Sequence, residues 1–321
     1  MALVLVTGAA GFLGSRLSER LLARGHQVTG VDCLTDSYDP EIKRDNLREA
    51  RVNPRFRFLE WDLAVHDLTE LPDADVVYHF AAQTGVRASW GRDFAVYLQR
   101  NLLATQRLLE RTIARPPRRL VYASSSSVYG DAERRPTSEE DRPRPFSPYG
   151  VTKLAAEHLC LLYQRNHGVP AVALRLFTVY GPRQRPDMGF HRFLEAVADH
   201  RPLEIYGDGR QSRDFTYVED VLDAAETAGE RGRPGSVYNV GSDRPISVLD
   251  ALEIVRQVTG LPVRVEFRPP VAGDVPHTAS DITRAREELG YAPRVPLEQG
   301  LAAQWKWHQA RRVRSAREAG A

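Results

Sequence analysis

The sequence predicts an α/β fold in which a doubly wound parallel sheet is followed by a smaller α/β lobe over its carboxyl edge. Three observations indicate this arrangement. Short apolar runs alternate with segments of helical spacing through the first half of the chain. A glycine-rich turn joins the first apolar run to the first helical segment. After Leu176 proline and glycine become dense and the regular alternation ends.

The alternating elements can be placed along the chain. Strands are expected at residues 2–6, 27–31, 55–59, 75–79, 119–124 and 171–176, and helices at residues 12–23, 94–113 and 149–166. The first helix has the pattern of an amphipathic helix, because Leu13, Leu17 and Leu21 recur at the spacing of one helix face. Since short connections join the strands through helices, we expect a parallel sheet that is covered on both faces.

The domain organisation follows from the same change of pattern. We expect residues 1–175 to form the sheet domain, which also receives part of residues 214–242. Residues 176–213 and 243–314 are expected to form the second lobe, and residues 315–321 a tail.

Composition excludes several classes of protein. Among 321 residues, 44 Lys and Arg nearly balance 42 Asp and Glu, so bulk charge indicates neither a nucleic-acid nor a membrane-surface partner. No apolar run approaches the roughly 18 residues of a membrane span. Cys33 and Cys160 are too few for a disulfide framework, which favours a reducing cytoplasm. Neither has the neighbouring ligands of a zinc site, so no metal is expected.

The glycine-rich turn, TGAAGFLG at residues 7–14, has the pattern of a dinucleotide-binding site of the Rossmann type. Gly8 permits the tight turn, Gly11 lets the backbone approach a pyrophosphate, and Gly14 lets the helix pack closely on the sheet. The first helical residues, Phe12 and Leu13, expose amides that bind phosphate.

A carboxylate indicates which dinucleotide is bound. Asp32 ends the second predicted strand, where it can accept hydrogen bonds from ribose hydroxyls and repel a 2′-phosphate. The next basic residue is Lys43, so no adjacent cation favours NADP, and the expected cofactor is NAD. Asp62 and Leu63, after the third strand, are expected near the adenine.

A candidate catalytic group follows the fifth strand. Tyr149 and Lys153 lie four residues apart at a helix start, so the ammonium is expected to lower the pKa of the phenol and let it act as a base. Lys153 is also a candidate ligand of the nicotinamide ribose. Four serines, at residues 124–127, close the strand, where a hydroxyl can bind a substrate alcohol or ketone oxygen.

These motifs together resemble the extended short-chain dehydrogenase/reductase superfamily, and the resemblance covers about residues 2–310. The segments HFAAQTGVRASW, YASSSSVYG, TVYGPRQRPDM and GDGRQSRDFTYVEDV are similar to its nucleotide-sugar epimerase and dehydratase branch. The resemblance implies a tightly held NAD, Tyr149 as the base and Ser125 as its serine partner. It also implies cofactor contacts from Phe80, Ala81, Ala82, Asn101 and Phe177.

Two segments discriminate within that branch. Dehydratases and decarboxylases of the family have acidic residues after the serine, whereas this chain has Ser126 and Ser127, which are not acids near neutral pH. The segment TVYGPRQRPDM resembles that of UDP-glucuronate 4-epimerases. Thr178 stands where enzymes for neutral sugars have Asn, and either Arg185 or Arg192 is expected to pair with a sugar carboxylate.

The second lobe is expected to bind uridine diphosphate. Arg213 is the main candidate for the diphosphate, with Arg87 assisting. Ile205 and Tyr206 are expected along the uracil. The resemblance places Asp274 near the uridine ribose, although Val271 stands where the family often has Arg, a gap that Arg268 is a candidate to fill.

The resemblance therefore implies NAD-dependent epimerisation of UDP-glucuronate to UDP-galacturonate at C4, through a 4-keto intermediate and without decarboxylation. The alternatives are a UDP-glucose 4-epimerase, then a UDP-glucuronate decarboxylase or sugar 4,6-dehydratase, and last a non-catalytic NAD sensor. A homodimer is the oligomer that the resemblance implies.

Overall fold

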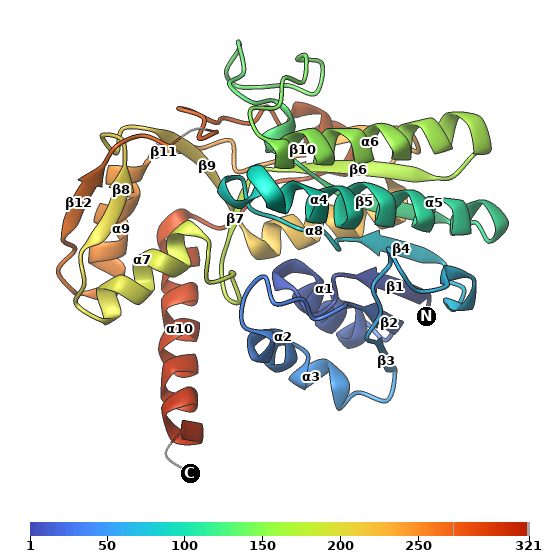
Figure 1. Ribbon diagram of the computed structural model, residues 1–321, viewed down its shortest axis with the longest axis horizontal. Helices are drawn as coiled ribbons and strands as arrows, with labels where there is room; N and C mark the ends of the chain where they lie inside the picture. Colours follow the sequence, from blue (N-terminus) through green and yellow to red (C-terminus); the bar gives the residue numbers. More distant parts are fainter. Residues whose placement is uncertain (272, 320–321) are drawn as a thin grey trace.

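A seven-stranded parallel sheet forms the centre of the molecule (Figure 1). The computed structural model describes residues 1–271 and 273–319. The strand order is β10-β6-β5-β4-β1-β2-β3, with an order reversal between β1 and β4. The bounds are β1 Leu3–Thr7, β2 Gln27–Val31, β3 Phe56–Leu59, β4 Val76–His79, β5 Arg119–Ser125, β6 Ala171–Leu176 and β10 Val237–Val240. The parallel pairing confirms the predicted doubly wound sheet.

Helices cover both faces of this sheet. Successive side chains of a strand point to opposite faces, and both sets are apolar here. On one face, Val6 and Val121 pack in one core with α1 (Phe12–Ala23) and α8 (Val218–Arg231). On the other face, Leu5 and Leu120 pack with α5 (Ala104–Ala114) and α6 (Pro148–His167). Two short helices, α2 (Pro40–Asn46) and α3 (Arg48–Arg51), connect β2 to β3.

The helix predicted at residues 94–113 is interrupted. The structure has α4 (Phe94–Tyr97), a π-helical turn η4 (Leu98–Leu103), and then α5. The wide turn carries the buried Asn101, whose carbonyl oxygen accepts a hydrogen bond from the Thr105 hydroxyl at 2.6 Å. Turns of this kind frequently occur at functional positions of a helix.

The second lobe lies at one end of the molecule (Figure 1). Its three-stranded sheet pairs β11 (Pro245–Ser247), β9 (Ser212–Tyr217) and β7 (Thr178–Tyr180), and its two-stranded sheet pairs β12 (Val265–Arg268) and β8 (Leu203–Tyr206). Helices α7 (Gly189–Ala198) and α9 (Val248–Thr259) pack nearby. Between these elements the chain returns to the central sheet through α8 and β10, within residues 214–242.

The last helix, α10, spans Leu297–Ala319. It runs through much of the segment predicted as a tail, and residues 320–321 of that segment lie outside the described residues. In the described part of the chain, no helix is both long and apolar enough to cross a membrane. The domain boundaries at residues 175 and 314 stay predictions.

Candidate active site

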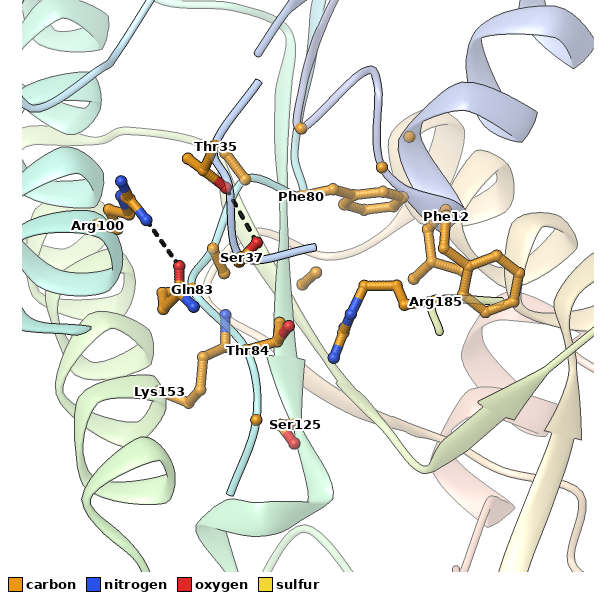
Figure 2. A pocket seen from close by; sticks show the side chains of 18 of the residues that line it. Phe12, Thr35, Ser37, Phe80, Gln83, Thr84, Arg100, Ser125, Lys153 and Arg185 are labelled. Atoms are coloured by element: carbon orange, nitrogen blue, oxygen red, sulfur yellow. Dashed lines mark hydrogen bonds between the residues drawn. The ribbon is translucent and has the colours of Figure 1, made fainter. Parts of the chain in front are cut away.

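A pocket of about 440 Å³ opens at the carboxyl edge of the central sheet, beside the order reversal (Figure 2). A crevice at this position is where open α/β sheets bind their ligands. The structure brings together most of the residues that the sequence predicts. The lining includes Gly8, Gly11, Phe12, Leu13, Gly14, Asp32, Asp62, Leu63, Phe80, Ala81, Ala82, Ser125, Ser126, Ser127, Tyr149, Lys153, Phe177, Thr178 and Arg185.

The turn from β1 to α1 requires its glycines. Gly8 has a φ of +73°, and a Cβ there would lie 2.8 Å from the backbone nitrogen of Ala81. A Cβ on Gly14 would lie 2.1 Å from the carbonyl oxygen of Gly8. No side chain caps the N-terminus of α1, so its first amides stay available to an anion. The turn therefore has the form of a pyrophosphate cradle.

Asp32 is held where a ribose would meet it. Its carboxylate accepts hydrogen bonds from the amides of Ala10 (3.1 Å) and Leu34 (2.9 Å), which lower its pKa, but burial raises the pKa more. The sequence gives no cation adjacent to Asp32, yet the structure brings one from α2. Lys43 binds the carbonyl and hydroxyl oxygens of Thr35 at 2.8 and 2.7 Å, and its charge lowers the Asp32 pKa.

Tyr149 and Ser125 approach each other from two elements. Tyr149 lies in the first turn of α6, whose start is set by Pro148 and by the Ser147 hydroxyl, an acceptor for the Gly150 amide. Ser125 ends β5. Burial raises the pKa of Tyr149, while hydrogen bonding with Ser125 and the charge of Arg185 lower it. The pocket thus holds a buried phenol with two groups that favour its ionisation.

Lys153 lines the same pocket as Tyr149. Its ammonium lies over the Tyr122 ring, 4.3 Å from the centroid, and burial lowers its pKa to about 7. The charge of Arg185, which comes from the opposite side of the pocket, also lowers the pKa of Tyr149 (Figure 2). The predicted effect of the Lys153 ammonium on Tyr149 stays a prediction.

A buried ion pair supports this part of the site. Glu157, one turn beyond Lys153 on α6, accepts hydrogen bonds from Arg175 on β6 at 2.6 and 3.1 Å. It also accepts one from the Ser124 hydroxyl at 2.6 Å. The contact ties α6 to the ends of β5 and β6, the elements that carry Tyr149 and Ser125.

The two arginines proposed for a carboxylate lie in different places. Arg185 points into the pocket and forms a bidentate ion pair with Asp187 at its rim. Arg192 lines a separate groove of about 750 Å³ and lies 4.0 Å from Glu204. Only Arg185 therefore shares the pocket with Thr178 and Tyr149.

Four other predicted residues do not line the pocket but gather around Arg87, which follows the lining residue Val86 in the chain. Arg87 donates to Asp274 at 2.7 Å, and its guanidinium carbon lies 4.1 Å from the centroid of the Tyr206 ring. Arg213 is close enough for the charges of Asp274 and Arg87 to affect its pKa, which burial lowers. Two cations beside an aromatic ring can bind a diphosphate that carries a base.

Three predicted residues do not line the central pocket. Two of them have buried side chains, and the third pairs with carboxylates elsewhere. The Ile205 side chain is 3% exposed and belongs to the core. Asn101 does not line the pocket. Its amide donates to the Gln83 carbonyl (2.9 Å) and its oxygen accepts from the Gln83 amide (2.7 Å), so it holds a loop that does line the pocket. Arg268 binds Glu204 and Glu266, each at 3.0 Å, in the separate groove.

Several lining residues were not predicted. They come from the loop after β2, from α2, from the loop after β4 and from the π-helical turn: Thr35, Ser37, Tyr38, Lys43, Gln83, Thr84 and Arg100. Arg100 donates to the Gln83 side chain at 2.9 Å (Figure 2). The signal for Gln83 and Thr84 was their place directly after the Ala81-Ala82 pair in the same motif.

Comparison with known proteins gives a consistent picture. Residues 4–241 match the model of the NAD dependent epimerase/dehydratase family. The chain is similar to a crystal structure of UDP-glucuronic acid 4-epimerase from Bacillus cereus in complex with UDP-glucuronic acid and NAD. The TM-score is 0.93 and the identity 41%, covering 96% of this chain and 99% of the other.

Two proteins that are similar in sequence carry names that refer to different sugars. A protein of Bacillus subtilis (strain 168), named uncharacterized UDP-glucose epimerase YtcB, is 42% identical over 93% of this chain and 95% of its own length. A UDP-glucuronate 4-epimerase of Thermodesulfobacterium geofontis is 37% identical over 96% of both chains.

Proposed function

Because the chain belongs to the NAD-dependent epimerase/dehydratase family, we propose that it interconverts UDP-glucuronate and UDP-galacturonate by inverting C4. The observation that carries this proposal is the guanidinium of Arg185, which points into the same pocket as Tyr149 and Thr178. An uncharged sugar has no group that needs such a cation. A uronate has a carboxylate one carbon beyond the ring.

NAD is the cofactor of this reaction, and when bound it would supply the acceptor and donor of the hydride at C4. We propose that the pyrophosphate lies on the turn of Gly8, Gly11 and Gly14, and that Asp32 binds the adenosine ribose. Lys153 and Phe177 would hold the nicotinamide end. In this proposal residues 1–175 with part of 214–242 bind NAD, and residues 176–213 and 243–314 bind the sugar nucleotide.

The proton at the sugar 4-hydroxyl is assigned to Tyr149. A phenolate at this position removes the proton as C4 is oxidised and gives it back as C4 is reduced. The Ser125 hydroxyl is assigned to the same sugar oxygen. Burial raises the pKa of Tyr149, and hydrogen bonding with Ser125 and the charge of Arg185 lower it.

Arg185 has a second task once C4 is oxidised. The intermediate is a β-keto acid, whose decarboxylation moves negative charge from the carboxylate to the enolate. An ion pair with Arg185 stabilises the carboxylate and opposes that shift of charge. Thr178, Ser126 and Ser127 line the same pocket and can hold the carboxylate by hydrogen bonds.

The nucleotide is assigned to the second cluster. Arg87 and Arg213 would bind the diphosphate, and Asp274, which pairs with Arg87 at 2.7 Å, would bind the uridine ribose. The Tyr206 ring and the backbone at Ile205 are the proposed uracil contacts.

A UDP-glucose 4-epimerase is the second candidate, and one observation favours it. Arg185 already has a carboxylate partner in Asp187, so its charge is balanced without a uronate. Dehydration and decarboxylation are less suited to the site, because Ser126 and Ser127 carry hydroxyls where an acid or base would act. A sensor without catalysis would have no use for the arrangement of Tyr149, Ser125 and Arg185.

The test is to incubate the purified protein separately with UDP-glucuronate and UDP-glucose and to follow products by NMR and released carbon dioxide. The proposal expects UDP-galacturonate, no stoichiometric carbon dioxide and no accumulation of free NADH. Conversion of UDP-glucose alone would make the second candidate correct. Stoichiometric carbon dioxide would identify a decarboxylase.

We also propose a homodimer in the cytoplasm. The outer faces of the η4 turn and α6 expose large apolar side chains, Leu98, Leu103, Val151 and Leu162, of which Leu162 is 52% exposed. An apolar surface of this kind suits a subunit contact. Both cysteines are free thiols, which suits a reducing compartment.

A further inference from the structure

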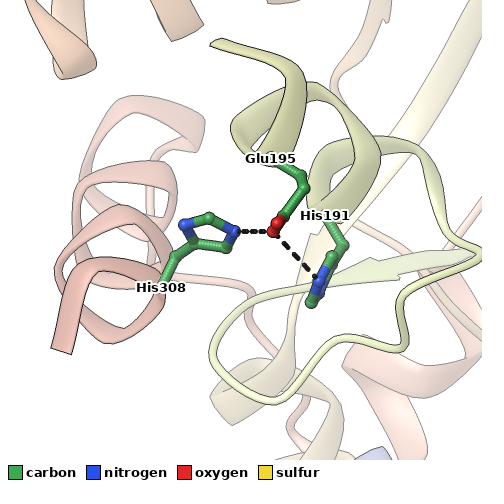
Figure 3. A group of neighbouring side chains, drawn as sticks. All are labelled: His191, Glu195 and His308. Atoms are coloured by element: carbon green, nitrogen blue, oxygen red, sulfur yellow. Dashed lines mark hydrogen bonds and ion pairs between the residues drawn. The ribbon is translucent and has the colours of Figure 1, made fainter. Parts of the chain in front are cut away.

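Two histidines and a glutamate converge in the second lobe (Figure 3). His191 and Glu195 lie one turn apart on α7, and His308 faces them from α10. The ligating atoms of the three side chains all lie within 4.8 Å of one another. His308 Nε2 is 2.6 Å from Glu195 Oε2, and His191 Nε2 is 3.9 Å from the same oxygen.

The tautomer of His191 follows from its neighbour. Its Nδ1 lies 2.8 Å from the carbonyl oxygen of Gln184, which can only accept a hydrogen bond, so Nδ1 carries the proton. In the neutral ring Nε2 then presents a lone pair toward Glu195 Oε2, 3.9 Å away. Two acceptors that face each other in this way favour a cation between them.

The surrounding contacts resemble the outer shell of a metal site. The Gln184 carbonyl orients His191, and Gln184 is itself held by its side-chain contacts with the His191 amide (2.9 Å) and with Gln304 (2.8 Å). The second oxygen of Glu195 accepts from Arg312 at 3.1 Å, and Arg312 also binds Asp199 at 2.6 Å. Outer partners of this kind fix the orientation of His191 and Glu195, whereas the buried Nδ1 of His308 has no hydrogen-bond partner among the described residues.

An ion also has a route to the cluster. His191 and Glu195 line the separate groove of about 750 Å³, and the Glu195 side chain is 40% exposed. The histidines are almost completely buried, at 4% and 1% exposure for His191 and His308. The charge of Arg311 acts on both histidines, and that of Arg312 acts on His308. Both charges oppose the binding of a cation and limit its affinity.

We propose that His191, Glu195 and His308 bind one divalent transition-metal ion, zinc in the first instance, with water completing the coordination. Two imidazoles and a carboxylate are ligands that zinc accepts. Ligand atoms around tetrahedral zinc are about 3.4 Å apart, so the ion replaces the proton between His308 and Glu195 and widens that contact.

The ion would join α7 to α10 at a distance from the sugar chemistry. Met188, which lines the central pocket, directly precedes α7, and Arg185 lies three residues before it. The metal would therefore brace the segment that carries Arg185. The proposal does not depend on which UDP-sugar the enzyme uses.

The experiment uses tag-free, chelator-treated protein titrated with Zn²⁺ by calorimetry and with Co²⁺ by visible absorption. The wild type is expected to bind one ion per chain and to give the intense visible bands of tetrahedral Co²⁺. His191→Gln, His308→Gln and Glu195→Gln should each weaken binding by at least about tenfold. His200→Gln, an exposed histidine after α7, is the matched control and should bind as the wild type does.

A change in melting temperature gives a second measurement. Zn²⁺ should raise that of the wild type and of His200→Gln, but not that of Glu195→Gln. Glu195 is the least buried ligand, so its variant keeps the test valid if a histidine variant fails to fold. Absence of Zn²⁺ and Co²⁺ binding to the wild type, or unchanged binding in Glu195→Gln and His308→Gln, would overturn the proposal and leave a hydrogen-bonded contact between helices.

Discussion

Arg185 and Asp187 form a bidentate ion pair in which Nε lies 2.9 Å from Oδ1 and Nη2 lies 2.7 Å from Oδ2. The same guanidinium lowers the pKa of Tyr149. One cation therefore connects a carboxylate of the protein, the candidate base and the position proposed for the sugar carboxylate. A uronate must share Arg185 with Asp187 or displace it.

Removing Arg185 tests the charged-sugar proposal. In Arg185→Ala the sugar carboxylate is buried without a partner, a loss of about 2–5 kcal/mol for a buried pair. KM for UDP-glucuronate should rise steeply, and some turnovers should release carbon dioxide, because the freed carboxylate can align with the ketone. Steady-state kinetics and trapped carbon dioxide measure both effects.

The control for that variant is Arg192→Ala, which changes an arginine of the separate groove. It should keep the wild-type KM. If Arg192→Ala loses UDP-glucuronate binding while Arg185→Ala keeps it, the role belongs to Arg192. If both behave as the wild type, the neutral-sugar epimerase becomes the better assignment.

Removing the competing carboxylate should have the opposite effect. Asp187→Asn releases Arg185 from a half-exposed ion pair, and such pairs are worth about 0.2–1 kcal/mol. KM for UDP-glucuronate should fall by a factor of roughly 1.4 to 5, while KM for UDP-glucose should not. An equal change for both sugars would mean that Asp187 shapes the pocket without competing for Arg185.

Loss of the phenol tests the candidate base. Tyr149→Phe keeps the ring but removes the only oxygen of that side chain that titrates, and general-base catalysis is typically worth about 10²–10⁴ in rate. We expect kcat to fall by at least that factor while NAD stays bound, as shown by cofactor fluorescence and stopped-flow assays. Wild-type kcat in this variant would exclude Tyr149.

The lowered pKa of Lys153 predicts how the free energy of unfolding depends on pH. Its pKa is lowered from 10.5 to about 7, so between these values the unfolded chain binds more protons than the folded one. Stability of the cofactor-free protein should therefore rise with pH across that window. Lys153→Met should flatten the slope in urea titrations; a slope identical to that of the wild type would assign the pH dependence to other groups.

Cofactor choice depends on two residues that are distant in sequence. Asp32→Ala removes the carboxylate that repels a 2′-phosphate but leaves Lys43 beside the site. The ratio of NAD to NADP affinity should fall, and the double variant with Lys43→Ala should recover part of it. Binding titrations with both cofactors measure the ratio. An unchanged ratio in Asp32→Ala would place the ribose elsewhere.

The sequence predicted those parts of the site that are local in the chain. The turn from Gly8 to Gly14 needs only its own backbone conformation, and Tyr149 and Lys153 need only the period of one helix. Their approach to Ser125 could be anticipated because carboxyl ends of parallel strands meet at one edge of the sheet. Short apolar runs that alternate with helical segments predicted the sheet in the same way.

Contacts between distant segments were decided by the tertiary structure. The charge of Lys43, on α2, acts on Asp32 at the end of β2, and the charge of Arg185, from the loop after β7, acts on Tyr149. Glu195 and His308 meet across 113 residues. Spacing along the chain carries no information about such pairs, because packing of whole elements sets the distance and burial sets the strength of the charge.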